Sequence, residues 1–78
     1  MSSYYYWVKK KIGEDSPIGD LARDIMLEQA RYRSFPINSQ SFRRLLGHFE
    51  TKYENANAIE AFCDSWGHYK YAQQCKNK

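Results

Sequence analysis

Residues 39–50 read SQSFRRLLGHFE, and this stretch decides the fold class. Four of its apolar residues fall at positions i, i+3, i+4 and i+7: Phe42, Leu45, Leu46 and Phe49. This spacing places them on one side of an α-helix, because the helix completes a turn every 3.6 residues. Ser39 can accept hydrogen bonds from the free amides of a first turn. The stretch therefore predicts an amphipathic helix that begins at Ser39.

The segment before this stretch carries a second helix with recognisable ends. Ser16 is a capping residue, and Pro17 is well tolerated at the first helical position. Six residues then follow on one side of a helix: Ile18, Leu21, Ala22, Ile25, Gln29 and Tyr32. Pro36 disfavours helical geometry at Phe35. We therefore expect this helix to end by about Arg33.

Two further segments have helical spacing, one at each end of the chain. The first is predicted from about Ser3 to Ile12, where Gly13 can end the helix. Its apolar stripe consists of Tyr4, Tyr5, Val8 and Ile12. The last helix is predicted after the polar residues 55–57 and extends to about Gln74. The residues on its apolar face are Ile59, Phe62, Cys63, Trp66 and Tyr69.

The length of 78 residues is that of one folded unit. A core of this size stabilises a domain by only about 3–5 kcal/mol. The seven Tyr, four Phe and two Trp residues compensate for the small size of the core, because large rings bury more apolar area per residue than aliphatic side chains do. We predict an all-α fold, a compact four-helix bundle over residues 1–75, with a frayed tail at 76–78. We also expect Trp66 to pack against Phe42 and Phe62.

The distribution of charge indicates where a partner would bind. The chain has twelve Lys and Arg residues against nine Asp and Glu, yet no acidic residue lies between Glu28 and Glu50. We predict an interaction surface for a protein or a nucleic acid, formed by Arg31, Arg33, Gln40, Arg43, Arg44, Gly47 and His48. On the third predicted helix these residues lie opposite the apolar stripe, and an exposed glycine there would let a partner backbone approach closely. A plain solvated face is the alternative.

No pattern in the sequence predicts a catalytic, metal or cofactor site. Cys63 and Cys75 are about 18 Å apart along one predicted helix and cannot form a disulfide with each other. Cys63 and His68 are about 140° apart around the helix, so they do not form a nucleophile and base pair. Two Cys and two His without short paired spacings do not indicate zinc. We expect a buried structural Cys63 and no small-molecule substrate, with a small enzyme or redox-responsive protein using Cys63 as the alternative.

The aromatic residues Tyr4–Trp7 are followed by the lysines 9–11, a combination that also occurs where proteins stack on bases or lie on membranes. Core packing is the stronger interpretation, because two of four consecutive rings must point inward on any helix. The chain has no apolar run of about 18 residues and no secretory segment behind Met1. We therefore expect a cytoplasmic protein with reduced thiols that does not bind membranes.

Several of these residues recur together in one known family. They are Tyr4, Tyr5, Trp7, Asp15, Ser16, Ile18, Ser34, Phe35, Pro36, Ser39, Phe42, Leu45, Phe49, Glu50, Phe62, Trp66 and Tyr69. In this set the chain resembles the YozE-like family of small Gram-positive bacterial proteins, which have a sterile-alpha-motif-like (SAM-like) fold. The Ser-Phe-Pro connector and the Phe-x3-Trp-x2-Tyr spacing are the most specific parts. The segment 21–35 is about one turn longer than the family pattern, and the chain is more basic.

This resemblance covers nearly the whole chain and implies a four-helix SAM-like bundle. It brings no catalytic residues, because the family has no assigned activity to transfer. A role in binding DNA would follow from the fold alone, which is a weak warrant for function.

Overall fold

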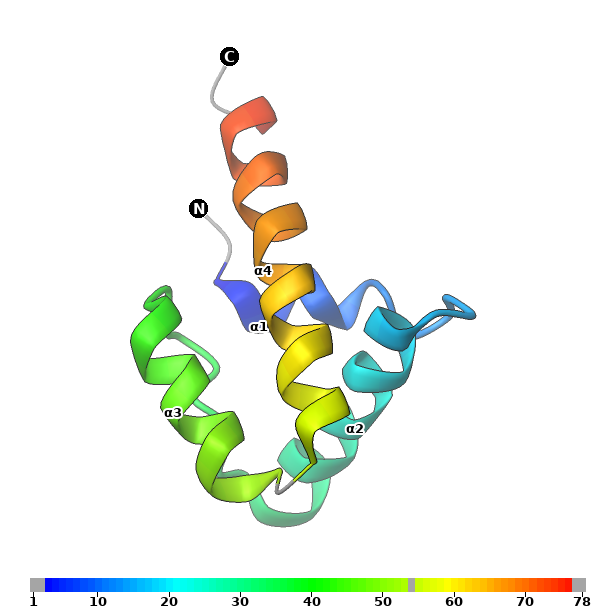
Figure 1. Cartoon of the computed structure of the whole chain (residues 1–78), viewed down its shortest axis with the longest axis vertical. Coiled ribbons are helices and arrows are strands. Elements are labelled where there is room, and N and C mark those ends of the chain that lie inside the picture. Colours follow the sequence, from blue (N-terminus) through cyan, green and yellow to red (C-terminus); the bar gives the residue numbers. More distant parts are fainter. Residues whose placement is uncertain (1–2, 54, 77–78) are drawn as a thin grey trace.

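The computed structural model describes residues 3–53 and 55–76. It contains the helices α1 (Tyr4–Lys9), α2 (Pro17–Tyr32), α3 (Phe42–Lys52) and α4 (Ala56–Lys76) (Figure 1). No strand occurs within the described ranges. The all-α fold with four helices, predicted from apolar spacing, is confirmed. Of the predicted frayed tail, Lys76 belongs to α4, and residues 77–78 lie outside the described residues.

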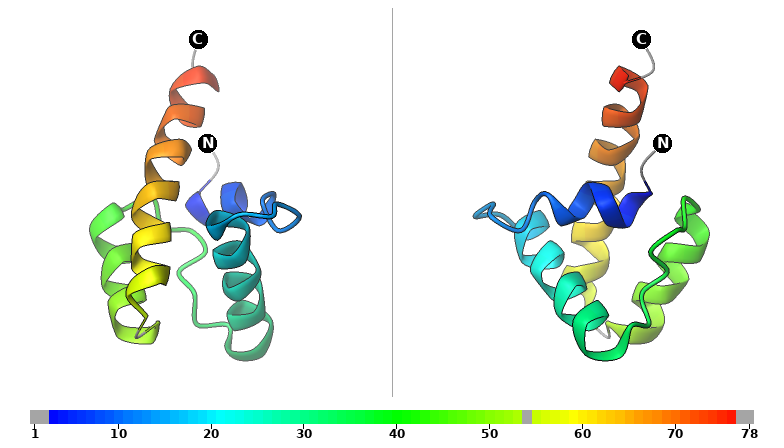
Figure 2. Two further views of the ribbon diagram at one scale, coloured as in Figure 1. Left: turned by 45° about the vertical axis from the view of Figure 1, so that its right-hand side comes forward. Right: turned by 180° about the vertical axis from the view of Figure 1, so that it is seen from behind.

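Helix α4 is the central element. It packs against each of the other three helices, and α1 also packs against α2. Helices α2 and α3 lie on opposite sides of α4 and converge toward their C-terminal ends (Figures 1 and 2). The C-terminal part of α4 extends past the rest of the molecule (Figure 2). Side chains of α2 and α3 can therefore meet near the end where both helices finish.

The beginning of α2 follows the sequence prediction. The Oγ of Ser16 accepts a hydrogen bond from the backbone N–H of Gly19 at 3.1 Å, and Pro17 is the first helical residue. The helix ends at Tyr32, and Arg33 adopts the left-handed conformation with a φ of 51°. This conformation stops the helix one residue after Tyr32 and turns the chain into the connector that leads to α3.

Helix α1 is shorter than predicted, because the α-helix ends at Lys9 and the chain continues in turns to Gly13. The backbone oxygen of Ile12 accepts a hydrogen bond from the Arg23 guanidinium at 2.6 Å instead of belonging to a helix. The Ile12 residue is 45% exposed, so its predicted place in the apolar stripe is wrong. Gly13 has no positive φ and does not act as a left-handed stop.

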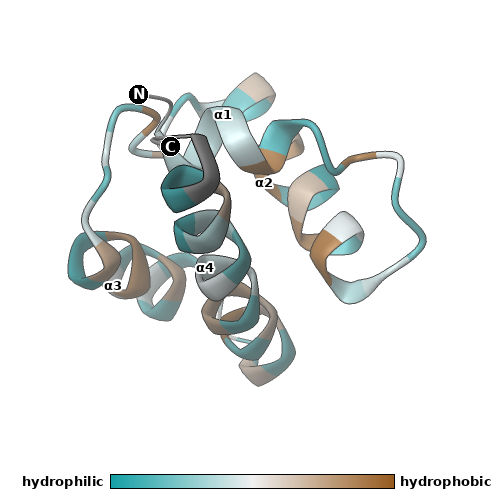
Figure 3. Ribbon diagram, turned by 90° about the horizontal axis from the view of Figure 1, so that it is seen from above, coloured by the Kyte–Doolittle hydropathy of each residue, from teal (hydrophilic) through white to brown (hydrophobic). Residues whose placement is uncertain are grey.

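The core is built mainly of aromatic rings around Tyr4, which is fully buried. The Tyr4 ring contacts Phe62 and Tyr69 edge to face, with centroid separations of 5.3 and 5.7 Å. Helix α1 is nevertheless mostly pale in Figure 3, because the hydropathy of tyrosine and tryptophan is close to neutral. Core packing of the aromatic start is confirmed for Tyr4 and Tyr5, whereas Tyr6 is 44% exposed.

The predicted contacts of Trp66 are confirmed. Its ring centroid lies 5.5 Å from that of Phe42 and 6.0 Å from that of Phe62. The indole itself is half-buried and packs against the edge of the core. Phe42 is 36% exposed, so this part of the core reaches the surface.

Two residues assigned to apolar faces are exposed instead. Tyr32 is 72% exposed, and the last turn of α2, to which it belongs, extends beyond the start of α4 (Figure 1). Cys63 is also exposed, which contradicts the predicted buried thiol. The buried stripe of α4 runs through Phe62, Ser65 and Tyr69, and Cys63 lies about 100° around the helix from Phe62.

Candidate interaction surface

Arg43 and Arg44 lie in the first turn of α3. The N-cap residue of this helix is Ser41, whose Oγ accepts a hydrogen bond from the backbone N–H of Arg44 at 3.3 Å. Ser39, the predicted start, accepts instead from the backbone N–H of Ser41 at 3.2 Å. The prediction is therefore wrong by two residues, because the Ser39 side chain stabilises a turn that precedes the helix.

The charges in this first turn are unfavourable for the helix. No acidic residue lies there, and no ion pair of Arg43 or Arg44 is recorded among the described residues. Both arginines are exposed. The N-terminal end of a helix dipole is positive, so a cation beside it destabilises the helix by about 0.3–1 kcal/mol. An anion bound at this end would interact favourably with the helix and with both guanidinium groups.

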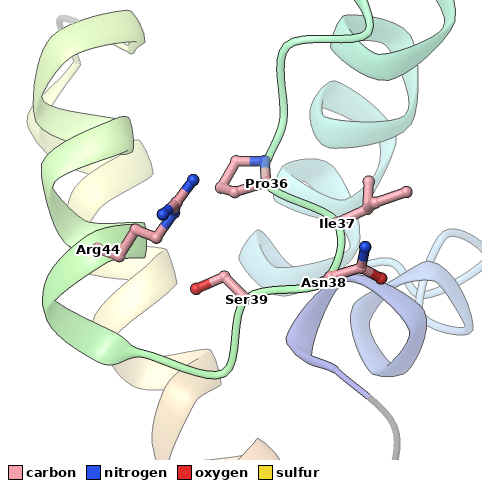
Figure 4. Close-up of a pocket in the computed structure, with 5 residues that line it drawn as sticks. All are labelled: Pro36, Ile37, Asn38, Ser39 and Arg44. Atoms are coloured by element: carbon pink, nitrogen blue, oxygen red, sulfur yellow. The ribbon is translucent and has the colours of Figure 1, made fainter.

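The Arg44 side chain faces the connector between α2 and α3. Together with Pro36, Ile37, Asn38 and Ser39 it lines a cavity of about 380 Å³. Figure 4 shows the guanidinium in the space between α3 and the connector, opposite Pro36, with the Ser39 hydroxyl on the same side. An anionic group in this cavity would meet one cation, a hydroxyl and an apolar ring.

The predicted surface is divided between two ends of the molecule. Arg31 lies in the last turn of α2 and shares a second cavity with Lys52 at the end of α3. Arg43 and Arg44 lie at the opposite end of α3 (Figure 1). Gln40 is exposed in the connector, just before α3. The four arginines therefore do not form one basic patch, although they occupy one acid-free stretch of sequence.

His48 does not belong to an exposed surface. Its side chain is 11% exposed, and its Nε2 lies 2.8 Å from Oε2 of Glu28. The imidazole packs edge to face against Phe35, with ring centroids 5.1 Å apart. The expected exposure of His48 on the outer face of α3 is contradicted, because the ring turns toward Glu28 of α2 and packs against Phe35 of the connector. Gly47, one residue earlier, is half-buried, and space for a Cβ is open beside it.

Glu28 is a functional candidate that the sequence analysis missed. Its side chain is 10% exposed, and Oε2 accepts hydrogen bonds from His48 and from the Ser34 hydroxyl, the latter at 2.6 Å. One available signal was its position: Glu28 follows Leu21 and Ile25 at i+7 and i+3, so it falls on the buried side of α2. A carboxylate at such a position must find partners inside the fold.

Tyr53 lies beside Glu28 at the end of α3. Burial raises the pKa of the Tyr53 hydroxyl well above its ordinary value, and the nearby Glu28 carboxylate raises it further. The hydroxyl oxygen is buried, and so is Oε1, the second carboxylate oxygen of Glu28. A hydrogen bond from the Tyr53 hydroxyl to the Glu28 carboxylate contributes to the raised pKa. The two buried polar groups therefore serve each other.

Cys63 lies in a shallow cavity of about 840 Å³ between α2 and α4. Its neighbours in this lining include the carboxylates of Asp20, Glu60 and Asp64. Neither a histidine nor a cation, the groups that usually activate a thiol, is among the lining residues. The arrangement exposes the thiol beside three carboxylates, without a histidine or a cation among the described lining residues.

Among residues 3–53 and 55–76, no group of three or more His, Cys, Asp or Glu side chains is arranged to hold a metal ion. None of the helices in this part of the chain combines the length and apolarity needed to cross a membrane.

The four helices and their order define a small helical domain of SAM-like class. A family model described as YozE SAM-like fold matches residues 3–71. Because the match spans most of the chain, the chain belongs to this family. No curated protein and no solved structure shows a significant match.

Proposed function

We propose that the chain is a non-enzymatic interaction module that binds an anionic partner at the N-terminal end of α3. The observation that carries the proposal is the placement of Arg43 and Arg44 in the first turn of that helix, without an acidic residue beside them. This arrangement costs helix stability, so a bound anion that offsets the cost is a physical reason for retaining it. The exposed Gln40 adds a hydrogen-bonding side chain next to the same turn.

The partner groups that fit are phosphates of a nucleic acid or carboxylates on a protein. Guanidinium groups bind both kinds of anion with two parallel hydrogen bonds. We take nucleic acid as the first candidate, because phosphates recur along its backbone and two of them can bind both arginines at once. We further propose that the protein acts in the cytoplasm, where its thiols stay reduced.

An enzyme that uses Cys63 is the rival from another class. Its support is the exposure of the thiol beside a cavity. The proposal of a binding module is preferred because the described lining residues include neither a histidine nor a cation, the groups that usually activate a thiol. Labelling by an alkylating agent does not separate the two functions, since an exposed thiol reacts whether or not it is catalytic.

The test is a titration of labelled duplex and single-stranded DNA with the full chain at about 50 mM salt, where phosphate contacts are strongest. Two arginines can neutralise about two phosphates, so log affinity should fall with log salt at a slope near −2 for duplex DNA. The variant Arg43→Ala with Arg44→Ala should lose most of the affinity. The matched control is Arg31→Ala with Arg33→Ala, which removes the same charge at the other end of the molecule.

Equal losses in the two double variants would show that net charge, not the α3 end, drives binding, and would contradict the proposed site. If neither DNA is retained by the unmodified protein at low salt, nucleic acid is not the partner. The acidic-protein version then requires a partner that is captured from lysate after nuclease treatment and is lost with the Arg43 and Arg44 variant. If no such protein is captured, the proposed function is wrong.

A further inference from the structure

The chain has two stretches without acidic residues, and the fold joins them. No Asp or Glu occurs in residues 1–13 or in residues 29–49. The first stretch includes α1, and the second includes the connector and most of α3. The hydroxyl of Ser3, just before α1, donates a hydrogen bond to the backbone oxygen of Ile37 in the connector. The beginning of α1 therefore lies next to the connector that lines the cavity of Arg44 (Figure 4).

The outer side of α1 carries exposed cations. Tyr4 and Val8 are fully buried and define the inner side of this helix. Tyr6 and Lys10 are four residues apart and lie together on the opposite side. Lys9 and Lys10 are both exposed, and no ion pair of either is recorded within residues 3–53 and 55–76. Their ammonium groups are therefore available to an anionic partner.

The Tyr6 ring lies between these lysines and the connector. It is 44% exposed and contacts Tyr5 edge to face, with ring centroids 5.1 Å apart. An edge-to-face contact leaves at least one face of the Tyr6 ring uncovered by Tyr5. The Tyr5 ring in turn packs against Phe35 of the connector at 5.8 Å. The next residue, Pro36, lies opposite the Arg44 guanidinium (Figure 4), so a row of rings leads from the outer side of α1 to the α3 end.

An exposed aromatic ring beside cations suits an unpaired nucleobase and the phosphates next to it. Every base has a flat face that can stack on such a ring, and the cations follow the backbone. In a duplex the bases already stack on one another, so only the phosphates would be bound. A membrane surface fits less well, because a helix that lies on a bilayer needs a broad apolar face and α1 has only six residues.

From this arrangement we infer that the anionic partner is a single-stranded nucleic acid, which extends from the first turn of α3 over the connector to the outer side of α1. A base stacks on Tyr6, and Lys9 and Lys10 bind the neighbouring phosphates. Other phosphates bind Arg43 and Arg44. This inference rests on the proposed function, because it extends the same site. It adds a preference for unpaired bases, which two arginines alone would not give.

Three labelled probes test this preference on the unmodified full chain by fluorescence anisotropy at about 50 mM salt. They are a thymidine strand of about 12 nucleotides, an abasic strand with the same number of phosphates, and a duplex of the same length. The thymidine strand should bind at least about fivefold more tightly than the abasic strand, because only the former can stack. Four cations should give a slope of log affinity on log salt near −3 for the thymidine strand.

Substitution of Tyr6 tests the stacking. Tyr6→Ala should weaken binding of the thymidine strand at least about fivefold and leave binding of the abasic strand unchanged. The matched control is Tyr32→Ala, which removes a ring that is 72% exposed in the last turn of α2 and should change neither affinity. Far-UV circular dichroism checks that both variants fold.

Substitution of the lysines tests the phosphate contacts of α1. The variant that carries both Lys9→Ala and Lys10→Ala should reduce the salt slope for the thymidine strand by about 1.4, since each phosphate contact on a single strand contributes about 0.7. The matched control carries both Arg31→Ala and Arg33→Ala, which removes the same charge away from the inferred path and should leave the slope unchanged.

Two results would overturn the inference and leave the proposed function intact, provided that the variant with Arg43→Ala and Arg44→Ala still loses affinity. They are equal binding of the thymidine and abasic strands, and an unchanged preference for the thymidine strand in a folded Tyr6→Ala protein. If the Arg43 and Arg44 variant instead binds like the unmodified protein, the proposed function is wrong and so is the path that starts at α3. Absence of binding to all three probes would also overturn the inference.

Discussion

The buried hydrogen bond between Tyr4 and Ser65 permits a sharp test of how the core is held together. The Oγ of Ser65 donates to the backbone oxygen of Phe62 at 2.7 Å. Since a serine hydroxyl has a single hydrogen, the Tyr4 hydroxyl must be the donor in its 2.7 Å contact with Ser65. Tyr4 and Ser65 are both fully buried, so neither hydroxyl can turn to water instead.

The two single substitutions therefore have different physical effects. Tyr4→Phe removes the donor, but Ser65 keeps its bond to Phe62, so the free energy of unfolding should fall by about 0.5–1.5 kcal/mol. Ser65→Ala leaves the Tyr4 hydroxyl buried without an acceptor, which costs about 1–3 kcal/mol. The higher helix propensity of alanine offsets about 0.5 kcal/mol of this loss.

The decisive comparison is Tyr4→Phe in the Ser65→Ala background. There the substitution removes an unpaired hydroxyl, so it should be neutral or stabilising, whereas it destabilises the original protein. The coupling energy between the two sites should be about 1–3 kcal/mol. Urea unfolding followed by far-UV circular dichroism measures each variant, and a constant m-value checks that the denatured state is unchanged.

Tyr71→Phe is the matched control, because the Tyr71 residue is 69% exposed and its hydroxyl is solvated. It should change the free energy of unfolding by less than about 0.5 kcal/mol. If Tyr4→Phe costs the same in both backgrounds, the hydrogen bond contributes nothing and the stability of this region comes from ring packing alone.

Three further predictions concern backbone fit, the edge of the core and pH. Gly19→Ala should lower the free energy of unfolding by more than about 2 kcal/mol, because a Cβ would collide with the backbone of the preceding loop. Gly67→Ala has open space for the Cβ, so it should raise the free energy of unfolding by up to about 1 kcal/mol, and thermal unfolding measures both variants. Trp66→Ala should lower the free energy of unfolding by about 2–4 kcal/mol, which is less than the loss expected for a fully buried indole, because Trp66 is half-buried. An unchanged urea midpoint in this variant would show that the ring contacts do not stabilise the fold. Burial raises the pKa of Tyr4 and Tyr53 above the ordinary 10.0, so the unfolded chain releases these protons first and the free energy of unfolding should fall as pH rises above about 10. The urea midpoint, measured up to about pH 11, should fall less steeply with pH in Tyr53→Phe than in the unmodified protein. Equal slopes in the two proteins would contradict a buried Tyr53 hydroxyl.

The helices were predictable where local signals are strong. Ser16 and Pro17 start α2 through a side-chain hydrogen bond and a fixed φ, both of which act within one turn. The boundaries that failed depend on distant partners. Ile12 leaves the helix because its carbonyl accepts from Arg23, eleven residues later, and no pattern within α1 contains that information.

The candidate sites were less predictable than the fold, because exposure depends on which helix covers which face. A helical stripe is about 100° wide, and residues at its border turn inward or outward according to the neighbouring element. Cys63 lies at such a border of α4 and is exposed, while the polar Ser65 is buried, with its hydroxyl hydrogen-bonded to that of Tyr4. His48 was assigned to the outer face of α3, but the connector and α2 cover it.

Arg43 and Arg44 lie at the positive end of the α3 dipole, where no acidic residue offsets their charge. A cation at this end destabilises the isolated helix, whereas a bound anion would reverse the effect. Binding of DNA at the α3 end should therefore raise the thermal unfolding temperature of the protein. The rise should be lost in the variant that carries both Arg43→Ala and Arg44→Ala and kept in the variant that carries both Arg31→Ala and Arg33→Ala. An equal rise in the two variants would mean that DNA does not stabilise the protein through the first turn of α3.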